Sequence, residues 1–182
     1  MDLEELKYPI GKYNQDGDIN QTQINEWIST LEALPKNLRS KVENLSYDCL
    51  NWSYRPKGWM IKQLVHHLAD SHMNSLIRFK LVMTEDDVTI KPYNQDAWSS
   101  LPDGNSDEIQ SSINILDGVH QRVVILLNDT NQDDWNRTFV HPEYDHKLTL
   151  GWMIGLYAWH CKHHLAHIDQ AIKHEGKFEF DQ

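Results

Sequence analysis

The sequence predicts an all-α protein, an antiparallel bundle of four long helices. Apolar residues recur every three or four positions through four long segments, which is the spacing of one buried helix face. No segment shows the alternation of a half-buried strand, and no internal repeat is present. Polar connections that contain proline and glycine separate the segments, as helices packed side by side require.

The first of these helices begins at Gln21, after an N-terminal arm of residues 1–20. The arm has no period and is punctuated by Pro9, Gly11 and the run Asp16-Gly17-Asp18. The buried face of the helix is predicted to comprise Ile24, Trp27, Ile28, Leu31 and Leu34. Pro35 either ends or kinks this helix, because proline lacks a backbone N–H and crowds the preceding turn, and the apolar pattern then resumes.

Three further helices are predicted in the same way. The second spans about residues 58–84 and is followed by a long polar loop. Ser106, with Glu108 just inside, marks the start of the third helix, because a hydroxyl and an acidic group stabilise exposed N–H groups there. After an irregular stretch, the last helix spans about residues 148–174.

The 182 residues fit a single domain, residues 1–182, whose core is large enough to fold without a disulfide or a structural metal. A metal bound by such a chain is therefore expected to be functional. The chain has 17 basic and 27 acidic residues, a formal net charge of −10. Phosphate backbones and anionic membrane surfaces repel such a chain, so neither nucleic acid nor a membrane is an expected partner.

The two cysteines, Cys49 and Cys161, form no CxxC motif. The first residues are acidic and lack the apolar run of a secretory signal. The longest apolar stretch, residues 148–158, contains two glycines and is too short to span a bilayer. We therefore expect a cytoplasmic protein.

Four of the 11 histidines, namely His160, His163, His164 and His167, lie in one eight-residue segment of the last helix. Residues four apart lie on one helix face, so His160/His164 and His163/His167 are both possible chelating pairs. On a helical wheel His164 lies about 50° and His160 about 90° from the centre of the apolar face, and His163 lies nearly opposite it. The wheel favours His160 and His164 as metal ligands. A solvent-facing cluster without a ligand is the alternative.

A catalytic transition-metal site usually has three protein ligands and one open position. The second helix offers His66, His67 and His72 as the third ligand. Periodicity directs His72 most closely into the apolar face and places His67 at the edge of that face. Because the His160/His164 pair also borders the core, either position could supply the third ligand, and periodicity alone does not choose between them. His72 could equally be a core histidine with a satisfied hydrogen bond.

His67 shares its side of the predicted helix with Ser71, Asn74 and Arg78. A solvated helix edge explains this polar stripe, but next to a metal the stripe would contact substrate. Arg78 is then the candidate for binding a substrate carboxylate through its planar fork of donors, with Asn74 beside it.

Three stretches of the sequence resemble the DinB/YfiT-like superfamily, and in particular its YfiT branch. They are YRPKGWMIKQLVHHLADSHMNS at residues 54–75, KPY at residues 91–93 and YAWHCKHHLAHI at residues 157–168. The resemblance covers nearly the whole chain. The YfiT branch comprises metal-dependent hydrolases related to bacillithiol S-transferases.

The resemblance implies a four-helix bundle with an up-down-down-up chain path and a homodimer. It also implies a metal site formed by His67, His160 and His164. Imidazole ligands suit zinc, nickel, copper and iron, and we expect one divalent ion per chain, zinc or nickel. One departure is Met60, where many relatives have Thr or Ser; this weakens the helix start and leaves the three histidines unaffected.

Three neutral imidazoles leave a metal its full positive charge, which activates a bound water or stabilises a bound thiolate. The first route gives a hydrolase and the second a thiol S-transferase with a low-molecular-weight thiol as co-substrate. No GxSxG motif is present and Cys161 faces the apolar side, so no catalytic side chain is predicted beyond the metal-bound water or thiolate. The loop near Trp98 and residues 141–147 could form the rim. The alternatives are a non-catalytic metal-binding or sensing bundle, and a bundle that acts only through dimerisation.

Overall fold

The computed structural model describes residues 2–15 and 17–178, and within them the four predicted long helices are present. They are α2 (Gln21–Val42), α4 (Ile61–Thr84), α6 (Gln110–Asn128) and α8 (Leu150–His174). Shorter elements precede and connect them: α1 (Leu3–Lys7) before α2, and then α3 (Tyr47–Leu50), α5 (Gln95–Ser99), α7 (Gln132–Trp135), and the antiparallel strands β1 (Thr138–Phe139) and β2 (Leu148–Thr149). The all-α, four-helix fold is confirmed.

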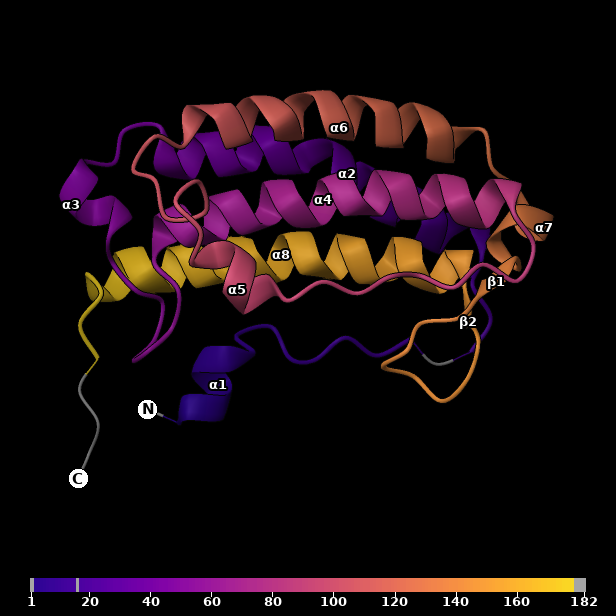
Figure 1. Ribbon diagram of the computed structural model, residues 1–182, viewed down its shortest axis with the longest axis horizontal. Coiled ribbons are helices and arrows are strands. Elements are labelled where there is room, and N and C mark those ends of the chain that lie inside the picture. The colour runs from indigo at the N-terminus through magenta and orange to yellow at the C-terminus, as the bar shows by residue number, and fades with distance from the viewer. Residues whose placement is uncertain (1, 16, 179–182) are drawn as a thin grey trace.

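The chain path is up-down-down-up. Helices α2 and α8 run in one direction and α4 and α6 in the other, and the connection that carries α5 returns along the length of the bundle (Figure 1). Each long helix packs against two others, so that α2 contacts α8 and α6 while α4 contacts α6 and α8. The pairs α2/α6 and α4/α8 are therefore antiparallel, and the long return connection makes α4 and α6 parallel.

Helix α2 continues through Pro35, so of the two predicted alternatives, an end or a kink at this proline, the end is excluded. Proline removes the N–H that would bind the carbonyl four residues earlier, which is that of Leu31. His120 of α6 takes its place, since its Nδ1 lies 2.5 Å from the Leu31 carbonyl oxygen. A side chain from a neighbouring helix thus satisfies the carbonyl that the proline leaves open.

The third long helix begins at Gln110, four residues after the predicted start. The Ser106 hydroxyl accepts a hydrogen bond from the Glu108 N–H at 3.1 Å, but it closes a turn that precedes the helix. Helix α4 begins at Ile61, where Met60 provides no side-chain cap. The Gln63 side chain compensates, because its Oε1 accepts the Met60 N–H at 3.0 Å.

The N-terminal arm, which includes α1, lies along α8 (Figure 1). The Gln170 side chain donates to the Leu6 carbonyl at 3.1 Å, and the Trp159 indole N–H donates to the Gly11 carbonyl at 3.1 Å. Of the punctuating residues predicted in the arm, Asp16 lies outside the described residues. The arm covers a face of α8 that a helix wheel treats as open. None of the helices described is long and apolar enough to cross a membrane.

Candidate metal centre

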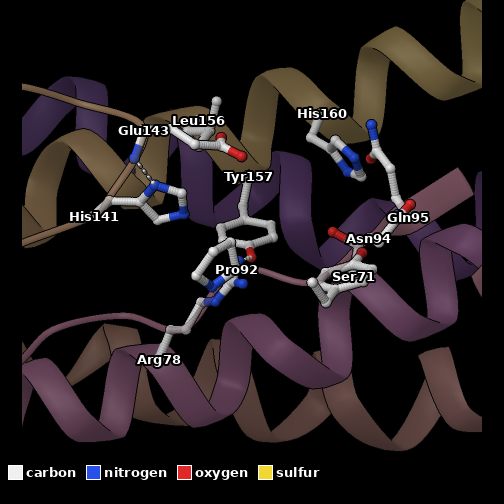
Figure 2. Close-up of a pocket in the computed structure, with 11 residues that line it drawn as sticks. Ser71, Arg78, Pro92, Asn94, Gln95, His141, Glu143, Leu156, Tyr157 and His160 are labelled. Carbon is white, nitrogen blue, oxygen red and sulfur yellow. Dashed lines mark hydrogen bonds between the residues drawn. The ribbon is translucent and has the colours of Figure 1, made fainter. Parts of the chain in front are cut away.

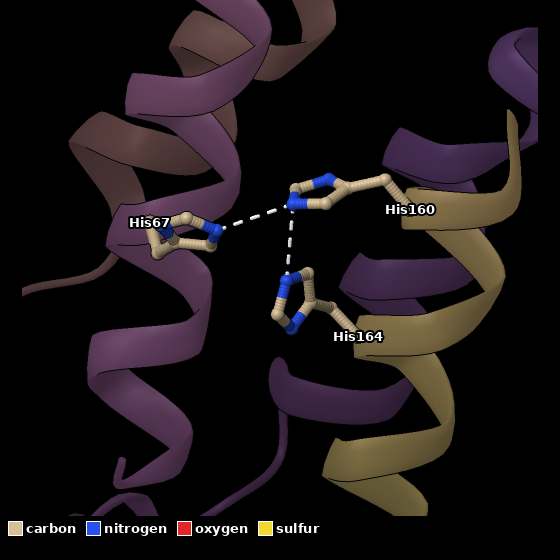
Figure 3. Close-up of side chains that lie close together, drawn as sticks. All are labelled: His67, His160 and His164. Carbon is tan, nitrogen blue, oxygen red and sulfur yellow. Dashed lines mark hydrogen bonds between the residues drawn. The ribbon is translucent and has the colours of Figure 1, made fainter. Parts of the chain in front are cut away.

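Helices α4 and α8 bring His67, His160 and His164 together (Figure 3). The Nε2 atom of His160 lies 3.2 Å from Nε2 of His67 and 3.1 Å from Nε2 of His164. One nitrogen from each of the three rings lies within 4.8 Å of the other two. The i, i+4 spacing on α8 brings two of the rings together, with centroids 4.4 Å apart and planes at 80°, and the antiparallel packing of α4 supplies the third.

The three imidazoles are neutral at pH 7. His67 and His164 are only 4% and 6% exposed. Burial lowers the pKa of His67 to about 4, and burial together with the neighbouring imidazoles holds the pKa values of His160 and His164 well below the ordinary value. A neutral imidazole keeps a lone pair, which is the form that binds a metal.

The converging nitrogens fit a divalent transition metal. Each neutral ring carries one N–H, and a lone pair that faces another lone pair at about 3 Å is repulsive unless a proton or a cation lies between them. Three imidazole nitrogens directed at one point are a typical donor set for zinc, nickel or copper. Within the described residues, the sequence-predicted ligands are therefore able to share one ion.

His72 lies behind this cluster. It is 1% exposed, and its Nε2 is 3.2 Å from Nδ1 of His160, the ring atom directed away from the other two histidines. The expectation of a core histidine with a hydrogen-bond partner is confirmed, and the partner is one of the candidate ligands. His66 points to α6, where it contacts the Ser112 hydroxyl at 2.7 Å.

Cys161 is buried, as predicted, with its Sγ 4.0 Å from Nε2 of His72. Burial raises the pKa of this thiol far above its ordinary value, so it remains protonated. It has the character of an inert core thiol.

The wheel places His163 nearly opposite the apolar face of α8, and the structure shows that this outer side is buried as well. His163 is 7% exposed, stacked on Trp159 with ring centroids 4.3 Å apart and near Tyr8 of the arm at 5.9 Å. A wheel treats α8 alone, so it does not show this burial, which comes from the arm that packs on the outer side of the helix. As a result His163, His164 and His167 form a second close histidine group, again with one nitrogen each within 4.8 Å.

A cavity of about 340 Å³ opens on one side of His160, and we call it the Arg78 cavity (Figure 2). Arg78 lines it and donates to the Tyr157 hydroxyl at 2.9 Å and to the Lys91 carbonyl at 3.1 Å. His141 and Glu143 form part of the wall, which agrees with the predicted rim.

One of the two predicted substrate-binding residues does not line a cavity beside the histidines. Asn74 is not among the lining residues, and its side chain donates to the Asp70 carbonyl at 2.8 Å. Trp98 itself packs on Tyr93, with ring centroids 4.4 Å apart, and the loop beside it lines the Arg78 cavity through Asn94 and Gln95, which agrees with the predicted rim.

A second cavity, of about 630 Å³, opens on the other side, and we call it the Arg55 cavity. Its walls include the indoles of Trp59 and Trp159, and its cations are Lys7, Arg55 and Lys57. Both cavities reach His160 and Gln95. Sequence periodicity missed this cavity because the walls that face α8 come from the arm and from the loop before α4, which have no period.

Comparison with known proteins relates the whole chain to one family. A family model described as the DinB superfamily matches residues 30–168. A protein of Oceanobacillus iheyensis, provisionally named a metal-dependent hydrolase, is 47% identical over 167 residues, which cover 92% of this chain and 96% of that protein. YfiT of Bacillus subtilis, named in the same way, is 42% identical over 171 residues, or 94% of this chain and 96% of that protein.

A solved structure shows the same fold. It is that of YfiT from Bacillus subtilis, described as a probable metal-dependent hydrolase with an unusual four-helix bundle topology. It superposes with a TM-score of 0.91 at 41% identity, over 94% of this chain and 98% of that chain.

Proposed function

The chain belongs to the DinB superfamily, and on that premise we propose that it is a metal-dependent hydrolase that acts on a small molecule. His67, His160 and His164 hold one divalent ion, zinc or nickel. The observation that carries the proposal is the convergence of their Nε2 atoms, with 3.1 Å and 3.2 Å between neighbours, in a cluster of neutral imidazoles. When bound, the ion supplies a Lewis acid that activates water for attack on the substrate.

Side chains around the ligands orient them and limit the access of water. His72 contacts Nδ1 of His160 at 3.2 Å and keeps that ring turned toward the cluster. The Trp59 indole packs on His67, with ring centroids 4.7 Å apart, and covers one side of the cluster. A partly dry site strengthens each electrostatic interaction inside it.

Arg78 is the proposed substrate-binding residue. The Tyr157 hydroxyl and the Lys91 carbonyl hold its guanidinium at the wall of the Arg78 cavity, which also reaches His160. A substrate carboxylate on Arg78 would place the rest of the molecule toward the three histidines. Asn74, the second sequence candidate, would have to leave the Asp70 carbonyl to join it.

Thiol S-transfer is the second candidate function, favoured by the two cavities that meet at His160. A reaction between a thiol and an electrophile needs two substrate-binding regions beside one metal. A hydrolase needs one substrate-binding region and a water molecule. In this version a bacillithiol-type thiol is the co-substrate, and its sulfur displaces the leaving group of the electrophile.

The proposal includes a homodimer in the cytoplasm with no nucleic-acid partner. The net charge of −10 supports the last point, because it opposes binding to a phosphate backbone. Sedimentation analysis at several concentrations tests the dimer.

Activity assays on metal-loaded protein test the function. Protein loaded with zinc or nickel is expected either to cleave an ester, amide or lactam, or to conjugate a low-molecular-weight thiol to a halide or epoxide. The metal-free protein and a His164→Ala variant serve as inactive controls. Metal-loaded protein that does neither contradicts the enzyme proposal and leaves a metal-binding or sensing module.

A further inference from the structure

A chain of hydrogen bonds leads from the N-terminal arm to the candidate metal ligands. Nε2 of His167 lies 3.1 Å from the backbone carbonyl oxygen of Lys7. Nδ1 of the same ring lies 3.3 Å from Nδ1 of His164. Nε2 of His164 in turn lies 3.1 Å from Nε2 of His160. Two histidines thus connect a carbonyl of α1 to the point where the three ligand nitrogens converge.

The carbonyl at the start of this chain fixes where each proton lies. A carbonyl oxygen only accepts, so Nε2 of His167 must carry the hydrogen. A neutral imidazole has one N–H, which leaves Nδ1 of His167 bare and able only to accept. Nδ1 of His164 must then be the donor, and Nε2 of His164 is left with its lone pair directed at the metal position.

Burial and packing hold this arrangement in place. His167 is 2% exposed, and its ring stacks on Tyr54 with centroids 3.8 Å apart and planes 25° from parallel. The backbone of Tyr54 is itself held by Gln170, whose side chain donates to the Tyr54 carbonyl at 2.6 Å. The His167 ring therefore has little freedom to turn away from either partner.

A different use of the same residues would be a second metal bound by His163, His164 and His167, whose nitrogens lie within 4.8 Å. The surroundings disfavour it. His164 would have to lose its one N–H proton and become an imidazolate to bridge two ions, and three cations, on Lys7, Arg55 and Lys57, line the same cavity. His163 has a buried Nδ1 without a hydrogen-bond partner among the described residues, but one free nitrogen does not offset these costs.

We propose that His167, anchored by the Lys7 carbonyl, is a positioning residue that fixes the ring tautomer of His164 and keeps its Nε2 free for the metal. The inference rests on the proposed metal site and extends it to the arm, because the acceptor that sets the proton positions belongs to α1. Replacing a residue that orients a ligand histidine through a hydrogen bond typically weakens metal affinity 10- to 100-fold.

The tautomer can be read directly by nitrogen NMR of the ring atoms in the metal-free wild-type protein. We expect His164 with its proton on Nδ1 and His167 with its proton on Nε2. This measurement needs neither metal nor a substitution, so it tests the positioning role even if the metal proposal fails. A proton on Nε2 of metal-free His164 would overturn the inference.

Three variants then measure the effect on zinc binding, by competition with a chelator. His167→Phe keeps a ring on Tyr54 but removes both nitrogens, and we expect a 10- to 100-fold weaker affinity and a mixed His164 tautomer. His167→Gln keeps a donor for Lys7 and an acceptor for His164, and should recover most of the loss. His163→Phe, which keeps a ring on Trp159, is the matched control and should bind zinc as the wild type does.

Stoichiometry separates this role from a second metal site. The wild-type protein is expected to bind one zinc per chain. Two zinc ions per chain, falling to one in both His163→Phe and His167→Phe, would show that the second histidine group is itself a site and that the positioning role is wrong. Unchanged affinity in a folded His167→Phe protein would also overturn it. Absence of zinc binding by the wild type would contradict the proposed function alone.

Discussion

Acid is expected to unfold the metal-free protein at an unusually high pH, because its core contains neutral histidines. Burial is the main cause that lowers the pKa of His67, His120 and His163 to about 4 and the pKa of His167 to about 3. In the unfolded chain each of these groups returns to its ordinary pKa of about 6.5. Between these values the unfolded chain binds protons that the folded protein does not.

Because the unfolded chain binds more protons, the stability of the folded protein falls as the pH falls. At pH 5.5 an unfolded histidine with an ordinary pKa carries about 0.9 proton, so these four groups give the unfolded state about 3.5 additional protons. Stability then falls by about 5 kcal/mol for each pH unit. The stabilisation is complete above about pH 6.5 and is lost as the pH falls toward about 4. Two pH units thus remove about 10 kcal/mol, so a domain in the lower two thirds of the ordinary range of about 5–15 kcal/mol should unfold within that distance below pH 6.5.

Urea denaturation of chelator-treated protein at pH 7.5, 6.5 and 5.5, followed by circular dichroism, measures this slope. A slope below about 1.4 kcal/mol per pH unit between pH 6.5 and 5.5 corresponds to less than one proton. Such a result would refute the argument that four buried histidines are neutral in the folded protein.

Three further outcomes are expected. Metal removal should leave the helical circular dichroism spectrum at pH 7.5 nearly unchanged, because the core is large enough to fold alone; loss of helix would make the metal structural. Arg78→Ala should weaken substrate binding, seen as a raised KM, while metal content stays at the wild-type value; an unchanged KM would exclude Arg78 from the substrate site. Gly155→Ala should destabilise the protein by about 1–3 kcal/mol in urea denaturation, because a Cβ there would lie 2.4 Å from the Tyr13 hydroxyl and 2.9 Å from the Trp27 ring. Gly118→Ala, with no atom within 4 Å of the new Cβ, should instead stabilise α6 by up to about 1 kcal/mol, and equal effects at the two glycines would contradict the packing.

The long helices were predictable because each buries one stripe over several turns, and the period is then unmistakable. The short helices α1, α3, α5 and α7 were not predicted, since elements of four or five residues are too short to show a period. The continuation of α2 through Pro35 depends on a tertiary contact, the bond between His120 and the Leu31 carbonyl. A prediction made from one helix at a time does not include contacts with a neighbouring helix, so it misses this one.

In the candidate site, too, the residues on a single helix were predictable from spacing and those that depend on contacts between elements were not. His160 and His164 followed from spacing on a single helix, whereas the choice of His67 over His72 came from the family resemblance. The structure gives the physical distinction, because His67 meets Nε2 of His160 and His72 meets Nδ1 of the same ring. The burial of His163 could not be foreseen, since it depends on an arm whose sequence has no helical period.

Metal analysis of the purified protein and of two alanine variants tests the central claim most directly. We predict close to one zinc or nickel per chain in the wild type, loss of tight binding in His164→Ala, and retention in His163→Ala, although both histidines are buried on α8. Elemental analysis after exhaustive dialysis gives the metal content, and circular dichroism confirms that each variant is folded. Equal loss of metal from the two folded variants, or a wild-type protein that retains none, would contradict the assignment of His67, His160 and His164 as the metal ligands.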